Sequence, residues 1–282
     1  MAIKLIGIDI DGTLLNSKKE LTPGTLDALR QAADRGVEIV ISTGRFLSEF
    51  PELVEALPMM RYTVTCTGAQ VLDLKTGETL ARHALTASEL KRLYEKLKHL
   101  DAMFQVFSDQ DGRIHNRASD LRQSERFCGP ALAQVLRRTH VAEEDLDAFV
   151  AGYTGLTNKI HMFFSEHQAK AQALALLSDE PYALMESADN DLELMAPGVD
   201  KGLGLRELAA HLGLDRSQVM AIGDGGNDAA MLRYAGLGVA MGNASPEALA
   251  AADQVTATND EDGAAKAILA VLEQEEPPCC TF

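Results

Sequence analysis

Polar side chains that could do chemistry stand directly after three short apolar segments of the chain. The three groups are Asp9 and Asp11; Thr43 and Gly44; and Asp224, Asn227 and Asp228. In open parallel α/β sheets, ligands bind outside the carboxyl ends of the strands. If the apolar segments are strands of one such sheet, the three groups meet at one site.

Asp9 and Asp11 are the strongest candidates for metal binding. Side chains two residues apart in extended backbone point to the same side, so these carboxylates would repel each other unless a cation lay between them. Oxygen ligands suit Mg²⁺. An EF-hand loop is excluded because Gly12 follows Asp11 at once. The structural alternative is a strand that simply ends in an Asp11-Gly12 turn.

The other groups suit an anion. Thr43 and Gly44 offer a hydroxyl and an unhindered backbone N–H at a strand-to-helix junction, although Thr43 could be a simple helix cap. Asp224, Asn227 and Asp228 crowd oxygen atoms into a glycine-rich turn, for which an Asx-type loop is the alternative. Lys201 lies at the entry to a predicted helix, outside any P-loop motif, where a lone lysine is ordinarily solvated.

Apolar strands alternate with helices in both outer parts of the chain. In the first part, Thr22-Pro23 is a helix start between predicted strands at 3–8 and 37–41. In the last part, a helix over 202–212 precedes predicted strands at 219–222 and 237–241. This alternation indicates a parallel sheet covered on both faces.

The middle of the chain differs, with longer strands and a predicted hairpin turn at 109–112. Its predicted strands are 103–107, 113–115, 159–164 and 192–195, and its predicted helices are 88–100 and 166–177. We therefore predict an α/β protein in which residues 1–83 and 197–282 form a Rossmann-like, parallel-sheet core. Residues 84–196 are predicted to form an inserted α+β domain.

Composition limits the partners. The 282 residues carry a formal net charge of -16 and no Trp, which argues against a nucleic-acid partner. No apolar stretch approaches the roughly 18 residues of a membrane span, and no export signal is evident, so a cytoplasmic protein is expected. Cys66, Cys128, Cys279 and Cys280 are expected to be reduced thiols, the last two inert in a terminal tail.

The ordered motifs resemble the haloacid dehalogenase superfamily, and within it the Cof-type sugar phosphatase branch. The matching stretches are DIDGTLL at 9–15, STGR at 42–45, PGVDKG at 197–202, GDGGND at 223–228, GVAMGNA at 238–244 and EDGAAKAI at 261–268. The inserted segment 84–196 matches the family's cap domain in position and size.

The resemblance implies an Mg²⁺-dependent phosphatase that hydrolyses small phosphorylated metabolites, with sugar phosphates as the expected class, through an aspartyl-phosphate intermediate. It implies that Asp9 is the nucleophile and a metal ligand, and that Asp224 is a further ligand. It makes Asp11 the general acid and then the base, with its backbone carbonyl on the metal. The remaining implied roles are phosphate binding by the Ile10 backbone, Thr43, Gly44, Lys201 and Asn227, and bracing of the metal shell by Asp228.

Two departures from the family pattern concern the substrate. Thr67-Gly68-Ala69 stands where the family often has Asn-Gly-Ala, and Phe46 where it often has Pro. A phosphotransferase or mutase on the same scaffold stays open as an alternative, as does a non-catalytic metabolite- or metal-binding module. The sequence does not choose between a monomer and a homodimer.

Overall fold

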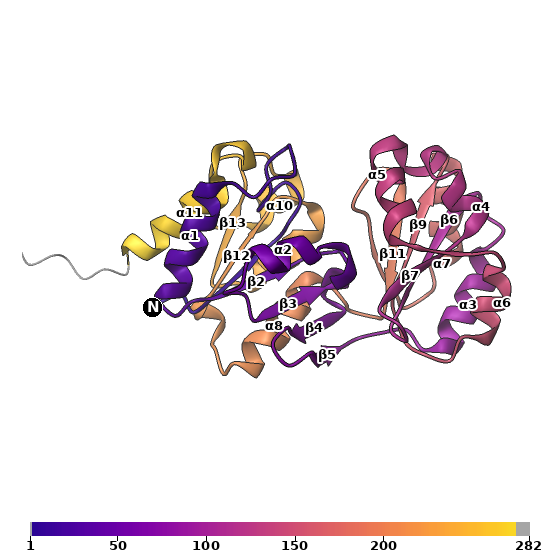
Figure 1. The fold of residues 1–282 in the computed structure, drawn as a ribbon, viewed down its shortest axis with the longest axis horizontal. Coiled ribbons are helices and arrows are strands. Elements are labelled where there is room, and N and C mark those ends of the chain that lie inside the picture. The colour runs from indigo at the N-terminus through magenta and orange to yellow at the C-terminus, as the bar shows by residue number, and fades with distance from the viewer. Residues whose placement is uncertain (1, 275–282) are drawn as a thin grey trace, which may run out of the picture. The chain divides into compact units, whose positions relative to one another are not determined.

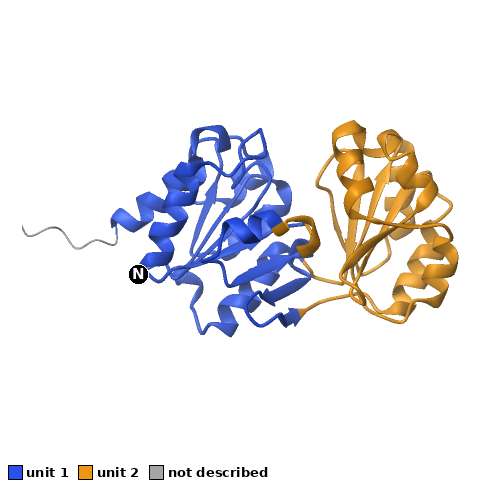
Figure 2. Cartoon of the chain, in the orientation of Figure 1, with its two compact units in different colours: residues 1–44, 52–81, 200–282 blue, residues 45–51, 82–199 orange. Residues whose placement is uncertain are grey.

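The computed structural model describes residues 2–274, and Cys279 and Cys280 lie outside this range. Two compact units divide the chain (Figure 2). Unit 1 contains residues 1–44, 52–81 and 200–282, and unit 2 contains residues 45–51 and 82–199. Among the described helices, none combines the length and the apolar composition that a membrane crossing requires.

Unit 1 is built on a sheet with the strand order β14-β13-β12-β1-β2-β3-β4-β5 (Figure 1). Its strands are β1 (Leu5–Ile8), β2 (Glu38–Ser42), β3 (Tyr62–Thr65), β4 (Gln70–Asp73), β5 (Glu78–Arg82), β12 (Val219–Gly223), β13 (Leu237–Ala240) and β14 (Gln254–Val255). Neighbouring strands from β14 to β3 are parallel, and β4 is antiparallel to β3. The predicted parallel α/β sheet is therefore confirmed.

Helices cover this sheet. They are α1 (Pro23–Asp34), α2 (Pro51–Ala56), α8 (Lys201–His211), α9 (Ala229–Tyr234), α10 (Pro246–Ala251) and α11 (Gly263–Gln274), with short 3₁₀ turns η2 (Cys66–Gly68), η3 (Arg216–Gln218), η4 (Gly226–Asp228) and η5 (Asn259–Glu261). As predicted, Thr22 caps α1: its hydroxyl accepts a hydrogen bond from the Thr25 N–H at 3.1 Å. Leu205 and Leu208 of α8 pack into the core beside Leu5 of β1.

Unit 2 has its own sheet, with the strand order β10-β11-β9-β6-β7-β8. Its elements are α3 (Ala87–Leu97), β6 (Ala102–Ser108), β7 (Arg113–Arg117), α4 (Ala118–Arg122), α5 (Glu125–Thr139), β8 (Val141–Glu143), α6 (Leu146–Gly152), β9 (Thr157–Phe164), α7 (His167–Leu177), β10 (Ala183–Met185) and β11 (Asp191–Met195). The sheet is antiparallel except for the parallel β7–β8 pair. The predicted β6–β7 hairpin is confirmed, and Gly112 takes the positive φ of 67° that its turn needs.

The segment 45–51, which includes the 3₁₀ turn η1 (Leu47–Glu49), groups with unit 2 and not with the residues that precede it. The Phe46 ring packs edge-on against Phe107, with centroids 6.0 Å apart, and the Glu49 carboxylate lies 3.8 Å from the His140 ring nitrogen. The sequence alone placed this segment in the predicted core 1–83. Its grouping here follows from these contacts with side chains distant in the sequence.

Candidate active site

Three neighbouring parallel strands, β12, β1 and β2, carry the predicted polar groups at their carboxyl ends. Ile8 pairs with Ile41 on one side and Ile222 on the other, so Asp9 is level with Ser42 and Gly223. The Asp9 N–H continues the ladder by donating to the Ile222 carbonyl at 3.1 Å. The parallel register thus brings three segments, remote in sequence, to one edge of the sheet.

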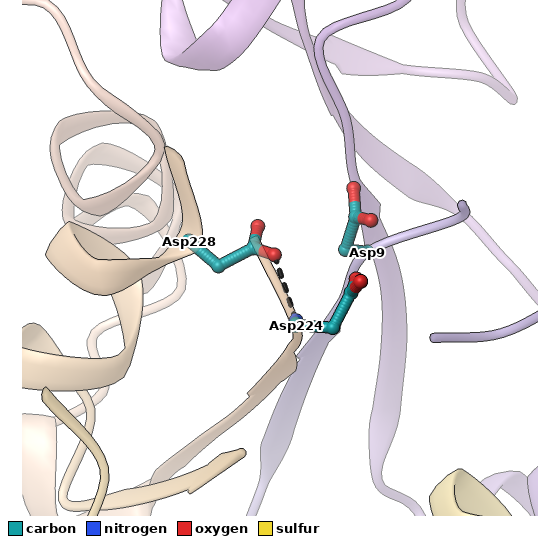
Figure 3. Close-up of side chains that lie close together, drawn as sticks. All are labelled: Asp9, Asp224 and Asp228. Atoms are coloured by element: carbon teal, nitrogen blue, oxygen red, sulfur yellow. Dashed lines mark hydrogen bonds between the residues drawn. The ribbon is translucent and has the colours of Figure 1, made fainter. Parts of the chain in front are cut away.

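Three carboxylates meet at this edge. One oxygen from each of Asp9, Asp224 and Asp228 lies within 4.8 Å of the others (Figure 3). The Thr13 hydroxyl donates to Asp224 Oδ1 at 2.9 Å and fixes that carboxylate. A Cβ on Gly12 would lie 2.3 Å from Asp224 Oδ2, so only glycine allows the carboxylate to lie against this turn.

Lys201 completes the cluster. Its side chain is 0% exposed, and its ammonium donates to Asp9 Oδ1 at 2.6 Å and to Asp228 Oδ1 at 2.5 Å. Burial alone would lower the pKa of this lysine, but the carboxylates of Asp228 and Asp9 raise it above its ordinary value. Lys201 is therefore a buried cation, and the alternative of a solvated surface lysine is wrong.

Asp228 holds the lysine and the glycine-rich turn together. Its Oδ2 accepts hydrogen bonds from the backbone N–H groups of Asp224 and Gly225, both at 2.9 Å, while Oδ1 accepts from Lys201 (Figure 3 shows the bond to Asp224). Both oxygens are thus already engaged with the protein. This agrees with a bracing role and leaves Asp9 and Asp224 as the better-placed metal ligands. Asn227 lies beside Asp228 in η4 and is partly exposed.

Asp9 and Asp224, the two candidate metal ligands, both have raised pKa values, so ionising both carboxylates at once is unfavourable. Burial raises the pKa of Asp9 to about 7, although the Lys201 ammonium lowers it in part and the charge of Asp228 raises it further. Burial, followed by the charge of Asp9, raises the pKa of Asp224 to about 6. A divalent cation would stabilise both ionised carboxylates, and a donor set made only of oxygen atoms suits Mg²⁺.

The Asp11 carboxylate does not join this cluster. It accepts a hydrogen bond from Lys19 Nζ at 2.8 Å, and within the described residues the carboxylates gathered here are Asp9, Asp224 and Asp228. Sequence reasoning put Asp9 and Asp11 on one side of an extended strand. β1 instead ends at Ile8 and the chain turns through Gly12, whose φ is 77°, so the extended-strand argument does not apply to Asp11. In addition to burial, the charge of Asp11 still raises the pKa of Asp9 and of Asp224.

The anion-binding candidates lie at the end of β2. Thr43 is buried, with 2% of its surface exposed, and Gly44 follows it directly. The Thr43 N–H donates to the Val64 carbonyl at 2.9 Å, and its own carbonyl accepts from the Thr67 N–H at 3.0 Å. These bonds fix the backbone of Thr43 beside β3.

Sequence reasoning missed the contacts of Thr13 and Lys19 and the position of Asn243. Asn243 Nδ2 donates to the Gly12 carbonyl at 2.8 Å. Asn243 and Thr13 did carry a signal, because both fall inside stretches that matched family motifs. Lys19 carried none, since its pairing with Asp11 depends on the path of the loop between them.

Comparison with known proteins decides the family. The sequence pattern of haloacid dehalogenase-like hydrolases matches residues 6–268. The chain belongs to this family. It is 32% identical over 271 residues to the putative phosphatase YxeH of Bacillus subtilis, covering 94% of this chain and 97% of that one.

Two further relatives have more specific names. The 5-amino-6-(5-phospho-D-ribitylamino)uracil phosphatase YcsE of Bacillus subtilis is 33% identical over 269 residues, covering 94% of each chain. The structure of the subclass IIB sugar phosphatase BT4131 superposes with a TM-score of 0.78 at 25% identity, covering 95% of this chain and 98% of that one. The chain is thus a phosphoric monoester hydrolase of the haloacid dehalogenase family that acts on small phosphorylated substrates.

Proposed function

We propose that the protein is an Mg²⁺-dependent phosphatase for small phosphorylated metabolites, sugar phosphates in particular, and that it works through an aspartyl phosphate on Asp9. The observation that carries the proposal is the contact between Asp9 and a fully buried lysine. A carboxylate held 2.6 Å from the Lys201 ammonium, at the carboxyl edge of a parallel sheet, is fixed in position for attack on an anionic group.

The reaction has two steps. The Asp9 carboxylate attacks phosphorus in line with the leaving oxygen, so that an acyl phosphate forms as the ester bond breaks. Asp11 protonates the departing alkoxide. Asp11 then removes a proton from water, which attacks phosphorus, releases inorganic phosphate and restores the Asp9 carboxylate.

The remaining residues stabilise the charge on the transferring group. Lys201 neutralises charge on the phosphoryl oxygens in both transition states. The Thr43 hydroxyl and the N–H groups of Gly44 and Ile10 hold the phosphoryl oxygens, and Asn227 contributes a further contact. Each of these residues belongs to unit 1.

Magnesium would be held by the Asp9 and Asp224 carboxylates and by the Asp11 backbone carbonyl, with Asp228 bracing this shell. It supplies a positive charge that offsets the negative charge on the phosphoryl group. The support is the shared carboxylate cluster, in which burial raises the pKa of both Asp9 and Asp224. The net charge of -16 also means that a phosphate must be held by a local positive site, such as a metal, a lysine or backbone N–H groups.

The substrate class rests on the relatives and on unit 2. One relative is named for a phosphorylated ribityl compound and another for sugar phosphates. We assign substrate selection to the inserted domain, predicted as residues 84–196, because binding energy from the non-reacting part of a substrate can orient the reacting centre. Deleting this insertion should reduce kcat/KM for sugar phosphates far more than for p-nitrophenyl phosphate, whose leaving group needs little help. An equal loss for both substrates would contradict the assignment.

The direct test is phosphate release from a panel of phosphorylated metabolites. We expect turnover with Mg²⁺, none with excess chelator, and recovery when Mg²⁺ is restored. Full activity in excess chelator would refute the metal assignment. Product analysis with sugars added as acceptors separates hydrolysis from phosphoryl transfer, because a phosphotransferase would give a new sugar phosphate in place of inorganic phosphate.

A further inference from the structure

Asn243 and the segment 258–262 lie beside the loop 12–17, which follows Asp9, and the reaction as described uses neither. Asn243 follows β13 and is solvent-exposed. Its Nδ2 donates to the Gly12 carbonyl at 2.8 Å and approaches Asp224 Oδ2 at 3.5 Å. Its Oδ1 accepts from the Asn259 N–H at 3.0 Å. One side chain therefore joins the turn at Gly12, the metal-ligand candidate Asp224 and the segment 258–262.

The segment 258–262 also holds the far end of the same loop. Asn259 Nδ2 donates to the Leu15 carbonyl at 3.0 Å. The Asp260 carboxylate accepts from the Ser17 N–H at 2.8 Å and from the Ser17 hydroxyl at 2.7 Å. Residues 12–17 are thus fastened at three points by groups more than two hundred positions later in the chain. The loop that follows the nucleophile is fixed by tertiary hydrogen bonds.

The contacts of position 243 suit an amide. The side chain must donate toward the Gly12 carbonyl and the Asp224 carboxylate, and it must accept from the Asn259 N–H. A carboxylate only accepts, an ammonium only donates, and an apolar side chain does neither. Asparagine meets all three needs with a short side chain.

Asn243 also affects the orientation of the Asp224 carboxylate. The Thr13 hydroxyl donates to Asp224 Oδ1 at 2.9 Å, and Asn243 Nδ2 lies 3.5 Å from Oδ2. Together these contacts favour one orientation of the carboxylate. Outer partners of this kind orient metal ligands, and losing one costs about 10- to 100-fold in metal affinity.

We propose that Asn243 is a positioning residue that orients Asp224 and the Gly12 turn for metal binding. The proposal rests on the proposed function, because it assumes that Asp224 is a metal ligand. Asn243 is not assigned any contact with substrate. Its effect is expected on metal affinity and, through Asp224, on the rate at low Mg²⁺.

The test compares Asn243→Leu, which has nearly the same shape but no hydrogen-bonding groups, with Gln254→Leu on the exposed edge strand β14 as the matched amide control. Mg²⁺ affinity is measured without substrate by titration calorimetry, and Tm is measured in chelator. We expect the Kd for Mg²⁺ to rise about 10- to 100-fold in Asn243→Leu. Tm in chelator should fall by only a few degrees, because the hydrogen bonds lost at this exposed side chain are individually weak. Excess Mg²⁺ should restore most of kcat. The control should match the wild type throughout.

Three results would overturn the proposal. A Kd within twofold of wild type would remove the positioning role while leaving the proposed function intact. A weaker Kd accompanied by a large fall in Tm would show a structural role only. A wild-type protein that binds no Mg²⁺ would refute the metal assignment itself, and this inference with it. If Asn243→Leu does not fold, Asn243→Ala is measured against the same criteria.

Discussion

Removing the buried ammonium of Lys201 should damage both stability and rate. The substitution Lys201→Met keeps most of the side-chain volume and removes the charge. It leaves Asp9 and Asp228, each within 2.6 Å of the ammonium in the wild type, without their shared cation. Breaking a buried ion pair on one side costs roughly 3 to 5 kcal/mol.

The lower end of that range is expected here, because Asp9 can take up a proton and so avoid being a buried, unpaired charge. Its pKa is already raised to about 7 with Lys201 present. A loss of about 3 kcal/mol corresponds to a fall in Tm of roughly 6 to 12 °C for a chain of this size. The fall should shrink from pH 7.5 to pH 5.5, because protonating the unpaired carboxylate becomes easier as pH drops. At saturating Mg²⁺, kcat should fall by about 10²-fold or more.

The matched control is Lys170→Met in unit 2. Lys170 is 7% exposed and donates to Glu186 at 2.6 Å, but no role in the reaction is assigned to it. The Lys170→Met variant should have a somewhat lower Tm than the wild type and the same kcat. Melting curves at two pH values and steady-state kinetics on both variants decide the matter. A Lys201→Met protein with wild-type Tm and kcat would refute the electrostatic account of the site.

Three further predictions concern unit 1. Asp9→Asn, measured with p-nitrophenyl phosphate, should lose at least ~10³-fold in kcat while remaining folded, because an amide cannot act as the nucleophile; substantial turnover would refute covalent catalysis. Mg²⁺ binding should weaken as pH falls below about 7 and should release protons, because Asp9 and Asp224 have pKa values raised to about 7 and about 6. Calorimetry in buffers of different ionisation enthalpy measures the number of protons released, and a Kd for Mg²⁺ that does not change with pH would contradict the prediction. Thr67→Asn should raise Tm by a few degrees, because Thr67 is β-branched at a φ of 58° that asparagine tolerates better; an unchanged or lower Tm would show that the buried threonine has contacts worth more than this strain.

The placing of the candidate active site was largely predictable from the sequence. Apolar runs before Asp9, Thr43 and Asp224 predicted three strands, and parallel topology alone then predicts that their ends meet. The start of α1 followed from the Thr22-Pro23 pair. These features are local or follow from a general rule of sheet architecture.

Other features depend on contacts between distant residues and could not be predicted. Nothing near Lys201 in the sequence shows that Asp9 and Asp228 will surround it, so its burial was unforeseen. The hairpin β4–β5 and the helix α5 were also missed. Helix α5 contains a kink at Gly129, with φ 73° and ψ 165°, followed by Pro130, a pair that the sequence alone suggests is a break.

Asn243 illustrates the same limit within the site. Its three hydrogen bonds reach Gly12, Asp224 and Asn259, which come from three separate segments of the chain. A match to a family motif marked the stretch as notable without indicating what the side chain does. Only the folded geometry connects it to the metal-ligand candidates.

The central claim is that the phosphoryl group is transferred to Asp9 before it reaches water. The stereochemical course at phosphorus tests this directly, whether or not the intermediate accumulates. An isotopically chiral phosphorothioate ester is hydrolysed in isotopically labelled water, and the configuration of the released thiophosphate is determined. Two successive in-line displacements each invert the centre, so the account predicts net retention. Net inversion would mean that water attacks the substrate directly, and Asp9 would then not be the nucleophile.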